Sequence, residues 1–287
     1  MGTYAVTGGA SGMGAATVAR LRAEGHAVIT VDQRDADVVA DLSTAEGRSA
    51  AAAGVLERSG GRLDGAVLAA GLGPTNDPGR VHLIAEVNYF GVVELLEAWR
   101  PALAAAGKAH VVAFSSNSTT TVPAVPGAVV RSFLAGDGRA AERAAARLGA
   151  KNAPAMAYAG SKIALSRWLR RAAVTADWAG AGIRLNAIAP GAILTPLLRK
   201  QLDDPATAGA IESFPVPIGG FGEPDALAAW VVFMLSPAAD FLCGSVVFVD
   251  GGTDAYFRAD DWPAAPGLLR VRAYLRRMRA FRPFPRP

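Results

Sequence analysis

The sequence predicts a single α/β domain in which helices cover both faces of a doubly wound, seven-stranded parallel sheet. Short apolar segments alternate along the 287 residues with longer amphipathic segments. The short segments are almost continuously apolar, which is typical of strands buried on both faces, as in a parallel sheet. In addition, 51% of the residues are hydrophobic and 19% are charged, a composition that favours a large buried core.

Strands and helices alternate through most of the chain. We predict strands at residues 3–7, 27–31, 37–40, 66–70, 110–114, 183–188 and 245–249. We predict helices at residues 12–24, 44–58, 81–106, 155–178 and 224–235. An insert at 117–154, with a helix-like stretch at 139–148, and a tail after 252 interrupt the alternation. The expected domain therefore spans 1–252, followed by an extension at 253–287.

A glycine-rich turn joins the first predicted strand to the first predicted helix. Residues 7–14 read TGGASGMG. Glycines let a pyrophosphate approach the backbone closely, and the free N–H groups of a helix N-terminus favour an anion. Such a turn also occurs with no ligand, but its place between strand and helix indicates a dinucleotide site. The predicted binding residues are Gly8, Ser11, Gly12, Met13 and Gly14.

Asp32, at the end of the second predicted strand, is the candidate for binding the adenosine ribose. A carboxylate there accepts hydrogen bonds from the ribose hydroxyls and repels a 2′-phosphate, so NAD is expected rather than NADP. Arg34 nearby weakens this preference, and a solvated turn aspartate is the alternative. Asp41 and Leu42 follow the third strand and are predicted to meet the adenine; for Asp41 the alternative is a helix N-cap.

Tyr158 and Lys162 form the candidate catalytic pair. Residues four apart on a helix share one face, so the ammonium lies close to the phenol. A free tyrosine has a pKa of about 10, and a nearby positive charge lowers it. A tyrosine tuned in this way protonates a carbonyl oxygen or deprotonates an alcohol. The spacing alone is common, and two surface side chains are the alternative.

Two polar residues accompany this pair. Ser116 follows the fifth predicted strand, where ligands bind in such sheets, and its hydroxyl is placed to orient a substrate oxygen; a turn-forming serine is the alternative. Asn88 lies among apolar residues in a predicted helix, although asparagine is a mediocre helix former. It is expected either to hold a water that relays protons or to bond a backbone carbonyl.

From about residue 3 to residue 252 the chain resembles the short-chain dehydrogenase/reductase family. The resemblance rests on residues 7–14, Ala70-Gly71, Asn88, Ser116, Tyr158 with Lys162, residues 184–191 and residues 249–252. It implies a Rossmann-type fold and an NAD(H)-dependent oxidoreductase that interconverts a secondary alcohol and a ketone. It also implies a catalytic tetrad of Asn88, Ser116, Tyr158 and Lys162. Further cofactor contacts implied by the resemblance are Ala70, Gly71, Tyr158, Lys162, Pro190, Gly191 and Thr195.

A narrower resemblance, to the bacterial hydroxysteroid dehydrogenase/carbonyl reductase branch of the family, rests on residues 40–48, 70–74 and 87–91 and on the long interval from Ser116 to Tyr158. Leu68-Ala69 stands where the family usually has asparagines, which puts a polar contact within the sheet in doubt. The apolar segment 193–220 is expected to be a mobile lid over the nicotinamide. It suits a hydrophobic substrate such as a steroid or another alicyclic or aromatic ketone, or it simply packs on the body.

The charge distribution bears on the partners. Eight arginines and three aspartates fall after residue 252, and the remainder of the chain has 21 basic and 22 acidic residues, so a nucleic-acid-binding body is not supported. The tail repeats apolar residues at helical spacing among arginines. This pattern suits an anionic membrane surface, an arm on a neighbouring subunit, or a solvated extension.

The remaining expectations concern location, assembly and metals. No apolar run is long enough to span a bilayer, the N-terminus has no secretory signal, and Cys243 is the only cysteine, so we expect a cytoplasmic protein without a metal site. We expect a homo-oligomer, a dimer if the insert blocks one interface. Rival functions are a non-catalytic NAD-binding sensor, a dehydrogenase for a non-steroid alcohol, and a related epimerase or dehydratase, against which the glycine spacing argues.

Overall fold

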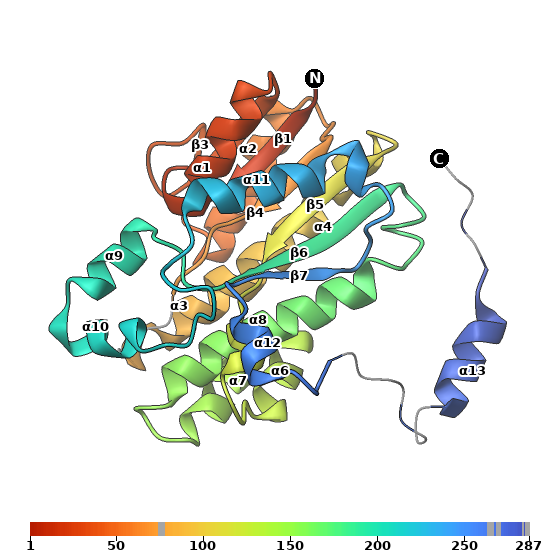
Figure 1. Ribbon diagram of the computed structural model, residues 1–287. Coiled ribbons are helices and arrows are strands. Elements are labelled where there is room, and N and C mark those ends of the chain that lie inside the picture. Colours follow the sequence, from red (N-terminus) through yellow and green to blue (C-terminus); the bar gives the residue numbers. More distant parts are fainter. Residues whose placement is uncertain (74–77, 263–266, 268–270, 283, 285–287) are drawn as a thin grey trace.

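The computed structural model describes residues 1–73, 78–262, 267, 271–282 and 284, and it confirms the predicted fold (Figure 1). A seven-stranded sheet has the order β3-β2-β1-β4-β5-β6-β7, and every pair of neighbours is parallel. The strands are β1 (Thr3–Thr7), β2 (Ala27–Asp32), β3 (Val38–Val39), β4 (Gly65–Leu68), β5 (Ala109–Phe114), β6 (Ile183–Pro190) and β7 (Val246–Val249). The chain order reverses direction between β1 and β4, where doubly wound sheets bind their ligands.

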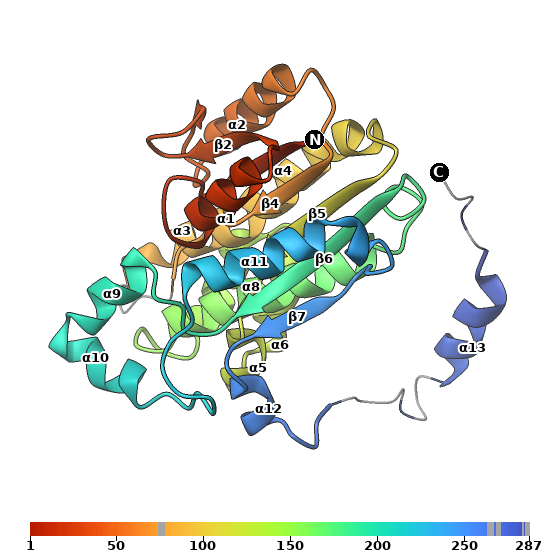
Figure 2. The ribbon, with the colours of Figure 1, turned by 45° about the horizontal axis from the view of Figure 1, so that its top comes forward.

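Helices cover both faces of this sheet, as Figures 1 and 2 show. One face packs against α1 (Gly12–Ala23) and α11 (Pro224–Leu235), through residues such as Leu21 and Val231. The other face packs against α2 (Ala45–Arg58), α4 (Gly91–Ala104) and α8 (Ala153–Ala172), with Trp99 and Leu165 fully buried. These two apolar layers explain why the strands are hydrophobic on both sides.

The segment 81–106 is helical, as predicted, but it is not one continuous α-helix. It consists of α3 (Val81–Ala85), a π-helical turn at Glu86–Phe90 and α4. In the turn, the N–H of Gly91 donates to the carbonyl of Glu86, five residues earlier. The extra residue rotates the chain locally, and such turns occur frequently at functional sites. Asn88 lies in the middle of this turn.

The predicted helix at 155–178 ends early, because α8 stops at Ala172. Beyond it the chain makes a series of turns, in which the N–H of Ile183 reaches the carbonyl of Trp178. Trp178 packs edge-on against Trp168, with 5.8 Å between the ring centroids. This aromatic contact holds the turns against α8, and β6 begins at Ile183.

The insert at 117–154 belongs to the core of the domain. It contains α5 (Ser118–Thr121), α6 (Gly127–Leu134) and α7 (Gly138–Ala146), of which only α7 corresponds to a predicted helix. Phe133 of α6 and Ala145 of α7 are buried in the same core cluster as Leu165 of α8. The insert therefore covers one side of α8 rather than extending into solvent.

The lid and the tail also contain helices. The lid carries α9 (Pro196–Leu202) and α10 (Pro205–Glu212), which project from the body (Figure 1). Neither helix was predicted from the sequence. After the sheet come α12 (Thr253–Phe257) and, in the tail, α13 (Val271–Ala280). Among the residues that the structure describes, no helix is both long and apolar enough to cross a bilayer.

Arg48 of α2 joins α2 to the helix around the π turn. Its buried guanidinium donates to Glu94 at 2.6 Å, to Glu86 at 2.8 Å and to the carbonyl of Leu42 at 3.2 Å. Removing one partner of a buried ion pair is costly, but both glutamates are partly exposed and regain water. We expect Arg48→Met to lower the free energy of unfolding by about 2 kcal/mol, measured by urea denaturation.

The control for this prediction is Arg100→Met. Arg100 pairs with Glu97 at 3.3 Å near the surface, and surface pairs contribute little. We expect that variant to change the free energy of unfolding by less than about 0.5 kcal/mol. Equal losses in the two variants would contradict the role assigned to Arg48.

Candidate active site

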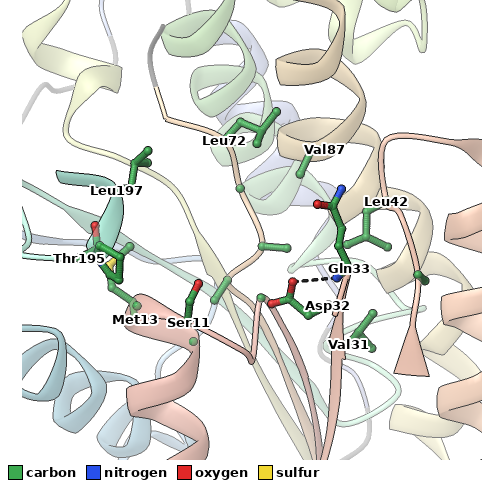
Figure 3. A pocket seen from close by; sticks show the side chains of 18 residues that line it. Ser11, Met13, Val31, Asp32, Gln33, Leu42, Leu72, Val87, Thr195 and Leu197 are labelled. Atoms are coloured by element: carbon green, nitrogen blue, oxygen red, sulfur yellow. Dashed lines mark hydrogen bonds between the residues drawn. The ribbon is translucent and has the colours of Figure 1, made fainter. Parts of the chain in front are cut away.

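A cleft opens at the carboxyl ends of β1, β2 and β4 (Figure 3). Its walls come from the glycine-rich turn, the ends of β2 and β4, the π turn and the start of α9. The lining residues are Gly8, Ser11, Gly12, Met13, Gly14, Val31, Asp32, Gln33, Ala40, Leu42, Ala69, Ala70, Gly71, Leu72, Val87, Thr195, Pro196 and Leu197. The structure thus brings ten of the predicted cofactor-binding residues into one cleft.

The glycines of the turn are required by its geometry. Gly8 has φ +70° and Gly12 has φ +55°, conformations that favour glycine. A Cβ atom on Gly14 would lie 2.1 Å from the carbonyl oxygen of Gly8, and one on Gly8 would lie 2.7 Å from the backbone nitrogen of Ala70. The turn is therefore compact, and α1 begins at the cleft with its free N–H groups. This arrangement fits the pyrophosphate of a dinucleotide.

Asp32 lies beside this turn and is held in place by backbone donors. Its carboxylate accepts from the N–H of Ala10 at 3.0 Å and from the N–H of Gln33 at 2.7 Å (Figure 3). A carboxylate fixed at this position suits the ribose hydroxyls of NAD and opposes a 2′-phosphate. Arg34, which made this preference less certain, is exposed and is not among the residues that line the cleft.

The end of the cleft beside Asp32 is apolar on one side. Leu42 and Val87 face it together with Val31 (Figure 3). Asp41 does not line the cleft: its carboxylate accepts from the side chain of Gln33 at 3.0 Å and from the N–H of Ser43 at 2.9 Å. The N–H of Ser43 lowers the pKa of Asp41. The N-cap of α2 is Thr44, so the capping role considered for Asp41 is wrong.

The start of the lid closes the other end of the cleft. Thr195 caps α9, and its methyl group would be 3.3 Å from a Cβ atom on Gly12. A side-chain atom of Leu197 lies 2.8 Å from the Cβ position of Gly73, so α9 contacts the loop after β4. Pro190 and Gly191, which were also predicted to contact the cofactor, are not among the residues that line the cleft. A Cβ atom on Gly191 would come 2.7 Å from Asp250, which explains the glycine by packing.

Ser116 and Tyr158 meet, although they are far apart in sequence. Ser116 is buried just beyond β5, where its Oγ accepts from the N–H of Ser118 at 3.1 Å, and Tyr158 lies on α8 beside it. Burial raises the pKa of Tyr158 above its usual value, and the neighbouring Ser116 side chain offsets part of this effect. The expected lowering of the pKa by Lys162 is not observed, because burial of the phenol dominates the shift and Lys162 is not among the groups that cause it.

Lys162 is buried one helical turn after Tyr158. Its Nζ donates to the carbonyl of Phe114 at 2.7 Å, at the end of β5, and lies 3.7 Å from the Cβ position of Gly71 in the cleft. Burial lowers the pKa of Lys162 to about 8, because the charged form is poorly solvated. The ammonium thus lies between the end of β5 and Gly71 of the cleft, at a cost in stability.

This cost depends on pH in a predictable direction. The pKa of Lys162 is lowered on folding, so between pH 8 and about 10 the unfolded chain binds more protons, and the free energy of unfolding rises with pH. Below pH 8 the cost is present in full. We expect the stability of Lys162→Met relative to wild type to fall by up to about 3 kcal/mol between pH 7 and pH 10.

Urea denaturation of both proteins across this pH range measures the difference. Lys151→Met, the same change at an exposed lysine, is the control for global effects of pH. A stability difference for Lys162→Met that stays constant with pH would argue that the lysine is not a desolvated cation.

Asn88 is completely buried and bonds the backbone of Leu72 twice. Its Oδ1 accepts from the N–H of Leu72 at 2.8 Å, and its Nδ2 donates to the carbonyl of Leu72 at 2.9 Å. Two roles were expected for the Asn88 side chain, and the structure shows one of them, the hydrogen bond to a backbone carbonyl. Asn88 therefore ties the π turn to the loop after β4 that carries Gly71.

Several lining residues were not predicted from the sequence. Gln33 extends along the cleft next to Asp32, and Leu72 and Leu197 flank the opposite end (Figure 3). Gln33 and Leu72 could have been predicted from the sequence, since they directly follow Asp32 and Gly71, two predicted cofactor-binding residues. Leu197 belongs to the apolar segment 193–220 that was expected to cover the nicotinamide, although the helix α9 that carries it was not predicted.

Comparison with family models, with characterised relatives and with solved structures identifies the family of this chain. A family model described as short chain dehydrogenase matches residues 3–129, and one described as enoyl-(acyl carrier protein) reductase matches residues 138–254. The chain is 42% identical to 3-alpha-hydroxysteroid dehydrogenase/carbonyl reductase of Comamonas testosteroni, over 90% of this chain and 98% of the relative. It is 31% identical to cis-4-hydroxycyclohexanecarboxylate dehydrogenase of Sinomonas cyclohexanicum, over 87% and 95% of the two chains.

Among solved structures, the 3-alpha-hydroxysteroid dehydrogenase from Pseudomonas sp. B-0831, complexed with NADH, superimposes with a TM-score of 0.81 at 44% identity. That comparison covers 91% of this chain and 100% of the other. The family models, the relatives and the fold give one result. The chain belongs to the short-chain dehydrogenase/reductase family of oxidoreductases.

Proposed function

We propose that this enzyme uses NAD(H) to interconvert a hydrophobic alicyclic secondary alcohol, such as a 3-hydroxysteroid, and the corresponding ketone. The observation that carries the proposal is the phenol of Tyr158, which lies beside Ser116 and one helical turn from the buried Lys162. This group adjoins a cleft whose glycine turn and Asp32 suit NAD.

The residues of the chain handle the proton of this reaction. NAD(H) supplies the hydride in the reduction and accepts it in the oxidation. In the reduction, the Tyr158 hydroxyl donates its proton to the ketone oxygen, while the Ser116 hydroxyl orients that oxygen. The raised pKa of Tyr158 keeps the phenol protonated at neutral pH, so the site is ready to act as an acid.

Lys162 acts on both the tyrosine and the cofactor. Its ammonium favours the phenolate that remains after proton transfer, because opposite charges attract strongly in a buried site. By family resemblance it also bonds the nicotinamide ribose, together with Tyr158. Gly8, Gly12 and Gly14 would hold the pyrophosphate.

The substrate class is supported by the lid. Leu197, Phe214 and Ile218 leave large apolar surfaces exposed, with 49%, 37% and 83% of their areas accessible. Leu197 lines the cleft, whereas Phe214 and Ile218 belong to the same segment 193–220, and exposed apolar side chains beside a cleft favour a hydrophobic ligand. The names of the relatives from Comamonas and Sinomonas, a hydroxysteroid and a hydroxycyclohexane dehydrogenase, agree with such a ligand.

The test is NADH oxidation with a 3-ketosteroid, a substituted cyclohexanone and an aldohexose, repeated with NADPH. We expect turnover of the two alicyclic ketones and at least tenfold preference for NADH, because Asp32 opposes a 2′-phosphate. Turnover of the sugar alone would contradict the substrate class. Tight NADH binding without turnover of any ketone would favour the alternative of a non-catalytic NAD-binding sensor.

We further propose a cytoplasmic homodimer formed through α11 and the edge strand β7. Trp230 and Phe233 of α11 and Phe241 beside β7 are large and exposed, whereas the insert covers α8. Sedimentation equilibrium should give a dimer, and Trp230→Glu with Phe233→Glu should give a monomer. A monomeric wild type would reject this assembly. The free thiol of Cys243 suits the reducing cytoplasm.

A further inference from the structure

The helix α13 of the tail has two chemically different faces. Val271, Tyr274, Leu275 and Met278 recur at positions i, i+3, i+4 and i+7, so they form one apolar stripe along the helix. We call these four residues the apolar stripe. The remaining sides carry Arg272, Arg276, Arg277 and Arg279. The function proposed above uses none of these residues.

The apolar stripe is exposed to water. No residue of α13 is buried, and Tyr274 and Met278 have 50% and 58% of their surfaces accessible. The helix stands apart from the sheet and its covering helices in both views (Figures 1 and 2). Leaving a continuous apolar stripe in water costs free energy, so a helix of this composition favours a surface that covers it.

The charge of the tail identifies the chemistry of that surface. No acidic residue follows Asp261, whereas seven arginines do. Residues 1–252 have 21 basic and 22 acidic residues, so a second copy of the domain offers a net charge of only −1 to seven arginines. A nucleic acid would engage the arginines but would leave the apolar stripe unused. An anionic bilayer surface matches both features.

We infer that α13 binds the surface of an anionic phospholipid bilayer and lies in the plane of the interface. The apolar stripe enters the boundary between headgroups and acyl chains, and the arginines contact lipid phosphates. Tyr274 and the exposed Phe281 add aromatic side chains of the kind that gather at this interface. The tail thus anchors the enzyme peripherally, without crossing the membrane.

The experiment measures co-sedimentation of the full-length protein with two kinds of vesicle. One kind is phosphatidylcholine alone, and the other is an equal mixture of phosphatidylcholine and phosphatidylglycerol. We expect at least tenfold tighter binding to the anionic vesicles, weakening as salt screens the charges. Equal binding to both kinds, or binding to neither, would overturn the inference.

A matched pair of variants tests the geometry. Leu275→Asp places a charge in the apolar stripe, and Ala273→Asp places the same charge on the opposite side of the helix. We expect Leu275→Asp to weaken binding to anionic vesicles at least tenfold more than Ala273→Asp does. Equal losses would mean that charge alone acts, and tighter binding to a DNA duplex than to anionic vesicles would assign the tail to nucleic acid; either result overturns the inference.

Both variants should keep the unfolding temperature of the wild type, because α13 has no buried residue. This readout is independent of the catalytic proposal, so a failure of one does not decide the other. Sedimentation of each variant without vesicles checks whether the tail instead mediates self-association. A change of oligomeric state on Leu275→Asp would reject the bilayer in favour of a second copy of the chain.

Discussion

Tyr158→Phe is expected to lower kcat for ketone reduction roughly 10³-fold while changing the affinity for NADH less than about twofold. The substitution removes one oxygen atom, which is the only atom of this side chain able to give up a proton. The ring remains, so the packing of α8 against the insert is preserved. Stopped-flow or steady-state NADH oxidation measures the rate, and quenching of protein fluorescence measures NADH binding.

The matched control is Tyr4→Phe. Tyr4 is also largely buried, but it lies at the amino end of β1, away from the cleft. We expect its rate to stay within about twofold of wild type, since no step needs that hydroxyl. If both variants turned over ketone as fast as the wild type, the assignment of Tyr158 as the proton donor would have to be abandoned.

Gly14→Ala is expected to destabilise the protein by about 4 kcal/mol or more and to abolish NADH binding at micromolar concentrations. The added methyl group would overlap the carbonyl oxygen of Gly8, at 2.1 Å, and backbone cannot rotate away as a side chain can. The start of α1 must therefore move away from β1, which opens the phosphate-binding turn. Urea denaturation and NADH titration measure the two losses.

Gly209→Ala makes the same substitution in a helix where nothing lies within 4 Å of the new atom. It is expected to stabilise the protein by up to about 1 kcal/mol, because alanine is the better helix former. A neutral Gly14→Ala, with NADH binding intact, would show that the turn is looser than its geometry indicates.

The sheet and most of the cofactor cleft were predictable from the sequence. All seven predicted strands are present, and β1 has the predicted bounds, because strands between two helical layers must be apolar on both sides. The glycine turn and Asp32 were predictable because a phosphate and a ribose each demand a particular residue type at a particular place on the fold.

The π turn was not predictable, because its cause lies outside its own sequence. The apolar pattern of residues 81–106 continues through the turn, and what stabilises it is the pair of bonds between Asn88 and Leu72. The role of Arg48, which needs Glu86 and Glu94 from another helix, was hidden for the same reason.

The lid helices were missed although a local signal existed. Thr195-Pro196 is a typical N-cap followed by proline in the first turn, and Pro205 begins the next helix. The apolar residues of the segment were interpreted as a lid for a hydrophobic substrate. None of the residues of α9 is buried, so the helix has no core-facing apolar pattern. Short exposed helices of this kind depend on caps more than on hydrophobic pattern.

The order of strands in the sheet has a consequence for synthesis of the protein. β5 pairs with β4 on one side and with β6 on the other, but the whole insert and α8 separate β5 from β6 in the chain. A ribosome therefore completes the nucleotide-binding half while one edge of β5, whose six residues all become buried, still has no neighbour. Such an edge is prone to aggregate, so the nascent chain should depend on chaperones until β6 has been made.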